Sequence, residues 1–399
     1  MNTIKKGQCE SEIIILFLVF FLHKYPAIEI RFPVFLYWGV TVVLFVLLLM
    51  NRKHDKLKSS IIFSIFGLSF MSYALLVSRT PILLGTYLLK ALELFIYLMM
   101  GRFLILSKKT KLVSFTLLYV FVYYVVTAIT TNIGCQLYPL ASRDLANGAQ
   151  GDSTLVAVYK QLNIGGFDYI YSVVLTVPLI VGYIRIKHNL HSSLIGFASL
   201  IIIALAIIVS QYTTALMIYL LGIVSFFFKK ESKSYLKPLL SVGVLFVIVT
   251  PLLNALSSYI EGDVLSARVN DIFDFLMGNQ NSITQIDGMD SRVEKWIKSM
   301  DFIISYPIVG AWFAARVGGH SFVLDNVAIF GILGIVLLVY MYKNVKTYLV
   351  VKYSGQISFI YLRYVLLLSI IIAILNPVSN IEFLVFELPL AGYFLTNLK

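Results

Sequence analysis

Residues 291–334 have the sequence SRVEKWIKSMDFIISYPIVGAWFAARVGGHSFVLDNVAIFGILG. The stretch begins with an arginine-led amphipathic segment and continues through a part broken by Pro307 and several glycines. It then places His320 beside a serine at the start of a very apolar run. This is the longest part of the chain with enough polar groups in one place to carry out chemistry. We therefore expect the functional site to lie here.

The composition of the chain is typical of a membrane protein. Of its 399 residues, 59% are hydrophobic and only 13% are charged, whereas soluble domains carry about 25% charged residues. Apolar runs of ~18–22 residues recur along the chain, each long enough to cross a ~30 Å hydrocarbon core as a helix. Because lipid offers no partners for unpaired backbone groups, these runs must be helical. The sequence predicts an all-α polytopic membrane protein in which residues 1–399 form a single integral membrane domain.

The apolar runs predict about twelve transmembrane helices. Two of the polar connections are long enough to form external loops, at 132–167 and 257–320. The second loop precedes the tenth span, and an i, i+4, i+7, i+11 apolar pattern that begins at Leu265 predicts an amphipathic helix within it. The spans are expected at residues 12–23, 32–50, 59–77, 81–101, 112–132, 168–184, 192–209, 212–228, 238–256, 321–342, 359–375 and 380–397.

The net charge of +12 is distributed in a way that indicates topology. The connections alternate, and those on one side of the bilayer, both termini included, hold 21 of the 32 basic residues. By the positive-inside rule this side is cytoplasmic, so both termini are predicted to lie in the cytoplasm. Basic clusters in such connections favour contact with membrane lipids, and we expect no nucleic acid partner.

The cysteines and the N-terminus add little further constraint. Cys9 and Cys135 lie on opposite faces in this topology, so a disulfide between them is not expected, and no metal-ligand spacing exists. The basic N-terminus lacks a small-residue cleavage site before Pro26, which predicts an uncleaved first span.

A few ionisable residues lie within the predicted spans. Lys90 and Glu93 are three residues apart on one helix face, where each can neutralise the other. Ionisable groups in a span are costly and mark candidate functional sites. A structural ion pair and a role in proton coupling both remain open for this pair. The other examples are Asp325 and the Glu382/Glu387 pair.

Polar groups also gather in the external connections. Arg143, in the first external loop, is either a phosphate contact or a solvated surface charge. The turn SQYTTALM at 210–217 holds a small polar cluster at membrane depth. Its hydroxyls are expected to bond carbonyls of the preceding helical turn.

The second external loop ends in a helix with two contrasting faces. Ser291 and Glu294 form a capping box that predicts a helix starting at Arg292, and Pro307 prevents its continuation. Such a helix suits a lipid diphosphate, because arginine can bind phosphate oxygens bidentately. The alternative is an interfacial helix whose cations meet only lipid headgroups. Its apolar stripe is Val293, Ile297, Met300 and Ile304, and its basic stripe is Arg292, Lys295 and Ser299, next to Trp296.

His320 differs from the other four histidines because Gly318-Gly319 precedes it and a predicted span follows it. A histidine at that boundary titrates near neutrality and could take a proton from a sugar hydroxyl. The alternative is a polar residue at a helix start in the membrane interface. Ser321 and Asp325 share a helix face on which His320 does not lie, so a Ser-His-Asp triad is not predicted.

Several motifs are absent. The cytoplasmic connections hold no domain that would bind a sugar nucleotide, no Asp-x-Asp metal motif and no P-loop. A donor, if the chain uses one, must therefore be pre-activated and embedded in the membrane, and a lipid-linked diphosphate sugar fits that requirement. No metal and no other cofactor is expected.

Together these motifs resemble those of a known family. Arg292 and Trp296 form R-x-x-x-W, residues 305–310 contain S-x-P-x-x-G, Gly319 to Asp325 form G-H-S-x-x-L-D, and residues 331–334 form G-I-x-G. With the predicted spans and the large external loop, the chain resembles the O-antigen and capsular polysaccharide polymerases (Wzy type). It is also similar to the related O-antigen ligases. The motifs cover about 45 residues, and the remainder is similar in topology only.

The resemblance implies a GT-C-like membrane fold and a glycosyltransferase of the bacterial plasma membrane. Such an enzyme joins undecaprenyl-diphosphate-linked repeat units on the external, periplasmic face, in lipopolysaccharide O-antigen or capsule biosynthesis. Arg292 would hold the pyrophosphate and His320 would act near the acceptor hydroxyl. A chain-length regulator and a flippase of the same pathway are the partners implied.

The chain departs from the family at one turn. Many members carry an arginine in an external S-x-S-R turn, whereas this chain has Ser210-Gln211-Tyr212-Thr213. A second phosphate-binding arginine must then come from elsewhere, and the candidates are Arg143, Arg268 and Arg316. Lys295, Trp296, Ser321 and Asp325 complete the predicted substrate-binding residues. The alternatives are an O-antigen ligase, which transfers finished glycan to an acceptor, and a lipid-linked glycan flippase or other transporter.

Overall fold

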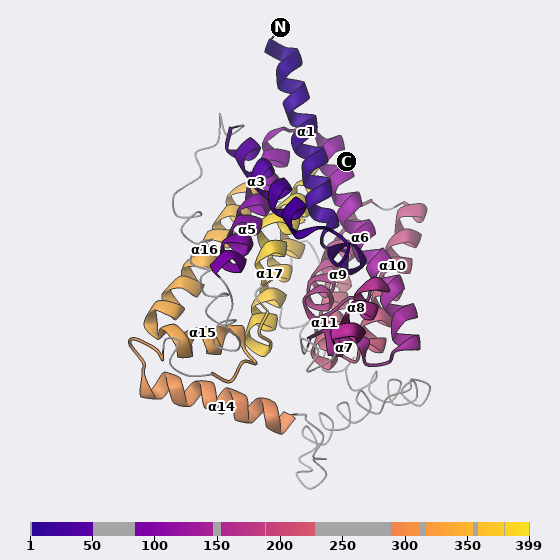
Figure 1. Ribbon diagram of the computed structural model, residues 1–399. Helices are drawn as coiled ribbons and strands as arrows, with labels where there is room; N and C mark the ends of the chain where they lie inside the picture. Colours follow the sequence, from indigo (N-terminus) through magenta and orange to yellow (C-terminus); the bar gives the residue numbers. More distant parts are fainter. Residues whose placement is uncertain are drawn as a thin grey trace.

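The computed structural model describes residues 2–50, 84–146, 153–187, 189–227, 289–311, 317–353, 358–378 and 380–398. These residues form helices joined by turns, with no strand among them. In this part of the chain three helices are long and apolar enough to cross a membrane: α6 (Thr110–Leu137), α9 (Phe167–Lys187) and α10 (Leu190–Val209). Figure 1 shows them within a bundle of helices. The all-helical prediction is confirmed for the described residues.

Helix α9 is the interior helix of the bundle. Of the residues in its most apolar segment, 72% are buried, whereas the corresponding share is 39% in α6 and in α10. It packs against α10, α11 (Thr213–Val224) and α17 (Ser358–Leu375). The outer helices present apolar side chains on their free faces, as lipid-facing helices do.

A second group of helices contains the first spans. Helices α1 (Asn2–Leu22) and α3 (Val34–Met50) pack together, and α3 packs on α5 (Leu84–Leu106). The short helix α2 (Pro26–Glu29) connects α1 to α3 and lies against α8 (Ser153–Gln161), which belongs to the connection between α6 and α9. There Lys160 pairs with Glu29 at 2.8 Å between Nζ and Oε1.

The segment around His320 lies at one end of the molecule. Helix α14 (Met289–Ser305) runs across the end of the bundle that is far from the start of α1 and from the C-terminus (Figure 1). It packs on α15 (Phe322–Phe330), which continues into α16 (Ile332–Tyr353).

The prediction of one continuous helix over 321–342 is wrong. The helix breaks at Gly331, whose φ of +58° only glycine adopts readily. The connection that leads out of α14 crosses the break: the Ile332 N–H donates to the Ile308 carbonyl at 3.3 Å. A Cβ on Gly310 would lie 2.2 Å from the Ile329 carbonyl oxygen, so the two backbones approach too closely for side chains.

The last predicted span also has an irregular helix. It begins with the π-helix η4 (Phe383–Glu387) and continues as α18 (Leu388–Thr396). Pro389 cannot donate to the Val385 carbonyl, and its ring would clash with that carbonyl in a regular α-helix. The wider π-turn immediately before the proline accommodates it. Gly101 of α5 lies against this turn. A Cβ on Gly101 would lie 3.4 Å from the Val385 carbonyl oxygen.

Ten of the twelve predicted spans each contain a described helix. The spans at 59–77 and 238–256, and the amphipathic helix expected from Leu265, lie outside the described residues, as do Arg268 and Arg316. The number of spans, their orientation and the GT-C-like arrangement therefore stay predictions.

Candidate functional site

Helix α14 does not start where the capping box predicts. Its first helical residue is Met289 rather than Arg292, so Ser291 lies inside the first turn and is not the cap. Residues 289–290, which precede the motif, already have helical backbone. The helix ends at Ser305, before Pro307, as predicted.

The two faces of α14 point in opposite directions. Ser299 is fully buried toward α15, whereas Ile297 and Ile304 are 53% and 73% exposed. The stripe that contains Lys295 and Ser299 therefore faces the bundle, and the apolar stripe faces away from it. The i, i+3, i+7 spacing places position 292 on the inward face. The side chain of Arg292 lies outside the described part of the structure.

Asp325 organises the contact between α14 and α15. Its Oδ1 accepts hydrogen bonds from Ser299 Oγ at 2.7 Å and from the Gly319 N–H at 3.1 Å, and its Oδ2 accepts from the Ser321 N–H at 3.2 Å. Asp325 is 1% exposed. A buried carboxylate with three donors is well solvated by the protein itself. It holds the Gly-Gly-His turn against α14.

The Gly318-Gly319 pair allows this turn to lie directly on α14. A Cβ on Gly318 would be 1.8 Å from the Lys295 carbonyl oxygen. The Gly318 N–H donates to Ser299 Oγ at 3.1 Å, and Gly319 has a φ of +77°. Both glycines are therefore required by geometry, one for close approach and one for backbone conformation.

This turn places His320 beside Lys295. The Lys295 Nζ lies 2.7 Å from His320 Nε2. A lysine ammonium can only donate, so Nε2 is the acceptor in the tautomer that carries its proton on Nδ1. Both residues were predicted site residues, and the structure brings them together on the inward face of α14.

The other residues predicted in this stretch have different surroundings. Ser321 caps α15, with its Oγ accepting from the Leu324 N–H at 3.1 Å, and it is fully buried. Trp296 has a buried indole N–H with no partner in the described part of the structure. That free donor suits a ligand contact, whereas the described atoms of Ser321 and Asp325 bond within the protein. Substrate contacts by all three stay predictions.

Arg143 lies beside the turn formed by Ser210–Thr213. It belongs to α7 (Ala141–Ala146), and the neighbouring Ser142 carbonyl accepts from the Tyr212 hydroxyl at 2.8 Å. Tyr212 is part of the Ser210–Thr213 turn. The structure thus brings Arg143 next to the Ser210–Thr213 turn.

The prediction that the hydroxyls of this turn bond preceding carbonyls is wrong for Ser210 and Thr213. Both hydroxyls, and both amide atoms of Gln211, are buried without a partner in the described structure. Gln211 has a φ of +57°, which ends α10 and moves the following residues out of helical geometry. The turn therefore keeps unused hydrogen-bonding groups.

Two further contacts connect this turn to the start of α15. The rings of Tyr212 and Tyr171 lie 6.1 Å apart, and the Tyr171 hydroxyl donates to Asn376 Oδ1 at 3.1 Å. The Asn376 carbonyl in turn accepts from the Phe322 N–H at 3.0 Å. A continuous series of contacts therefore connects the residue next to Arg143 with the start of α15, which follows His320.

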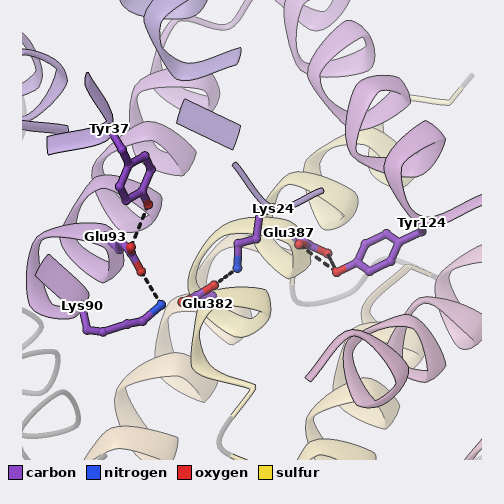
Figure 2. Close-up of polar contacts among 7 residues, drawn as sticks. All are labelled: Lys24, Tyr37, Lys90, Glu93, Tyr124, Glu382 and Glu387. Carbon is purple, nitrogen blue, oxygen red and sulfur yellow. Dashed lines mark hydrogen bonds and ion pairs between the residues drawn. The ribbon is translucent and has the colours of Figure 1, made fainter. Parts of the chain in front are cut away.

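A second polar cluster lies inside the helical bundle (Figure 2). The predicted pair is present, with Lys90 Nζ 2.8 Å from Glu93 Oε2. The Tyr37 hydroxyl of α3 donates to the other oxygen of Glu93 at 2.7 Å. Because Glu93 is 6% exposed, these two donors take the place of water. We call the whole set in Figure 2 the charged cluster; its members are Lys24, Tyr37, Lys90, Glu93, Tyr124, Glu382 and Glu387.

Lys24 brings the turn after α1 into the cluster. Its ammonium pairs with Glu382 and lies 5.1 Å from the centre of the Tyr97 ring. Burial alone would lower the pKa of Lys24, but the Glu382 carboxylate outweighs it and holds the pKa above its ordinary value. Lys24 therefore stays charged.

Glu387 has no cation among its described partners. Its two oxygens lie 3.0 Å and 2.9 Å from the same Tyr124 hydroxyl. On an α-helix, residues five apart point about 140° away from each other. The π-turn brings such residues to roughly the same side. In Figure 2, Glu382 contacts Lys24, while the Glu387 carboxylate lies beside Lys24 and is directed at the Tyr124 hydroxyl.

Sequence reasoning identified four members of this cluster as charges within spans and predicted the Lys90–Glu93 pair, but not that this pair and the two glutamates of the last span belong to one cluster. Lys24, Tyr37 and Tyr124 were missed. The available signal was the presence of ionisable residues in apolar runs, which must find partners. Which partners they find depends on segments as much as 358 positions apart.

The described residues contain no group of three or more His, Cys, Asp or Glu side chains that could hold a metal ion. Comparisons with family models, curated proteins and solved structures found no match for the chain. The chemistry must therefore be argued from the two sites themselves.

Proposed function

We propose that the chain is a polysaccharide polymerase that joins lipid-diphosphate-linked oligosaccharide repeat units at the external face of a bacterial plasma membrane. The observation that carries this proposal is the Lys295–His320 pair on the inward face of α14. A cation beside an imidazole nitrogen combines a phosphate contact with a base. Both groups are positioned by a glycine turn that Asp325 holds in place.

In the proposed reaction, the hydroxyl of an incoming lipid-linked unit attacks the anomeric carbon of the growing chain. The bond between that carbon and the diphosphate oxygen breaks, and the lipid diphosphate departs. Lys295 and Arg292 draw toward the diphosphate, which frees His320 Nε2 to accept the hydroxyl proton. Cations near the departing oxygens stabilise the developing charge.

Arg143 is the best-supported candidate for the second arginine. It lies next to the Ser210–Thr213 turn, which is connected through Tyr171 and Asn376 to the start of α15. The unused hydrogen-bonding groups of Ser210 and Gln211 are suited to the same ligand. We expect Arg143→Ala to reduce chain extension, but less than the loss of Arg292.

The test uses membranes that contain each variant at normal protein abundance. Arg292→Ala and His320→Ala are expected to leave single-unit glycans, because the diphosphate contact or the base is lost. Lys298→Ala is the matched control, since Lys298 is an exposed cation of the same helix. Wild-type chain lengths in both Arg292 and His320 variants would contradict the proposal.

Two rival functions have separate tests. An O-antigen ligase would transfer finished glycan to another acceptor, so purified protein given only lipid-linked repeat units would make no ladder of products. A lipid-linked glycan flippase is favoured by the charged cluster, because charges that meet within a bundle are typical of transport pathways. Translocation of a fluorescent lipid-linked glycan by purified protein in vesicles, without change in its length, would support the flippase.

A further inference from the structure

The charged cluster is accessible although it lies among buried helices. The side chains of Lys24 and Lys90 are 37% and 58% exposed, and that of Glu382 is 28% exposed. Their neighbours on α5, such as Ile96 and Met100, are fully buried. Water, or a ligand that replaces it, can therefore reach these charges.

The cluster has unused hydrogen-bonding capacity of both kinds. Lys90 has three N–H donors and only Glu93 as its described partner. Glu387 has two carboxylate oxygens, and the one donor that they share is the Tyr124 hydroxyl. A carboxylate can accept about four hydrogen bonds. In Figure 2 the free donors of Lys90 and the free acceptors of Glu387 lie on opposite sides of the Lys24–Glu382 pair.

Aromatic rings lie directly beside these groups. The Tyr97 ring lies under the Lys24 ammonium and is 5.4 Å from the Phe386 ring. The Tyr123 and Tyr124 rings are 5.1 Å apart. Such rings offer flat apolar faces beside polar groups.

This combination excludes the simpler ligands. Three carboxylates repel an inorganic anion, and two ammonium groups repel a metal cation, for which the described ligand atoms are also too few. A proton alone would use Glu387 but none of the free donors of Lys90. A neutral ring with many hydroxyls uses the donors, the acceptors and the aromatic faces together.

We propose that the charged cluster binds a neutral sugar residue of the lipid-linked glycan. This inference rests on the proposed function, because it assumes a glycan substrate, and it assigns that substrate a second contact away from His320. The Asn376 carbonyl bonds to the start of α15, and Glu382 lies six residues further along the chain.

The experiment measures glycan affinity directly. The probe is the oligosaccharide released by mild acid from the cell's own lipid-linked repeat units, titrated into purified full-length protein by calorimetry. Lys90→Met and Glu387→Gln are each expected to raise Kd about tenfold or more, because each removes hydrogen bonds to a charged group. Lys160→Met breaks the Lys160–Glu29 pair, which has a similar geometry outside the cluster, and should leave Kd unchanged.

The outcomes separate this inference from the polymerase proposal. Absence of saturable binding to wild type, or an unchanged Kd in Lys90→Met, overturns the sugar site even if the protein makes a product ladder. Weakened binding in the variants supports the site even if wild type makes no ladder, which would refute the polymerase. Lys90 is largely exposed, so its variant tests the site even where Glu387→Gln does not fold.

Discussion

The carboxylates at the two sites have opposite surroundings. Asp325 is 1% exposed, and its hydrogen bonds include those from the Ser299 hydroxyl and from two backbone N–H groups. Glu382 keeps 28% exposure and pairs with Lys24, an ammonium that is itself accessible. Asp325 has little unused hydrogen-bonding capacity for a ligand, whereas Glu382 belongs to the charged cluster, which has unused donors and acceptors.

This difference indicates a division of tasks. A carboxylate bonded to the backbone of a turn fixes the position of that turn, as Asp325 does for His320. Paired charges that remain accessible are still partly hydrated, so the protein has not desolvated them completely. They can therefore exchange partners when a ligand arrives. We infer that the α14–α15 contact is built for rigidity and the charged cluster for binding.

The largest effect is expected from Gly318→Ala. The new methyl group would lie 1.8 Å from the Lys295 carbonyl oxygen, and a backbone atom cannot rotate away. Helix α14 and the His320 turn must separate, and a misplacement of about 1 Å costs on the order of 100-fold in rate. Chain-extension rates should fall accordingly, with Gly39→Ala as the control because its Cβ position meets nothing within 4 Å. A Gly318→Ala enzyme of wild-type rate would contradict the close contact.

Asp325→Asn and Glu382→Gln compare the two carboxylates directly. The amide introduced at position 325 would point its own N–H groups at the N–H and O–H groups that now donate to Asp325. We therefore expect the free energy of unfolding in detergent to fall by about 2–4 kcal/mol. The corresponding change at Glu382 should cost about 1 kcal/mol or less, because Lys24 keeps access to water. Denaturant titrations of both variants measure the difference. Equal losses would remove the distinction between a rigid site and an open one.

The smallest effect is expected from pH. The His23 ring, in the turn after α1, stacks on Tyr37 at 3.8 Å between centroids. Burial lowers its pKa below 6.5, with Lys90 and Lys160 acting in the same direction and Glu29 and Glu93 opposing. The unfolded chain therefore takes up more protons as the pH falls through about 6.5, and stability decreases there.

His23→Phe keeps the stacking and removes the titration. The Tm difference between pH 7.5 and pH 5.5 should be smaller in this variant than in wild type, by roughly 1 °C. An identical difference in the two proteins would show that His23 is not responsible. The variant also tests whether the charged cluster, which Tyr37 joins, depends on this neighbouring ring.

Local features of the site were predictable from sequence, and contacts between distant segments were not. The Lys90–Glu93 pair follows from i, i+3 spacing, and the end of α14 follows from Pro307. The break at Gly331 was missed, because it depends on the backbone of Gly310 arriving from another segment. The start of α14 was missed because residues upstream of a capping motif can also be helical.

The sequence by itself determined that the chain is helical and apolar and that residues 291–334 hold its densest polar groups. Both follow from local physics, since a backbone surrounded by apolar side chains must satisfy its own hydrogen bonds. Only the tertiary structure decided that the Lys295 stripe faces inward and that Lys24 meets Glu382. These outcomes depend on which helices pack together, because the partner of a charge is set by packing rather than by spacing along the chain.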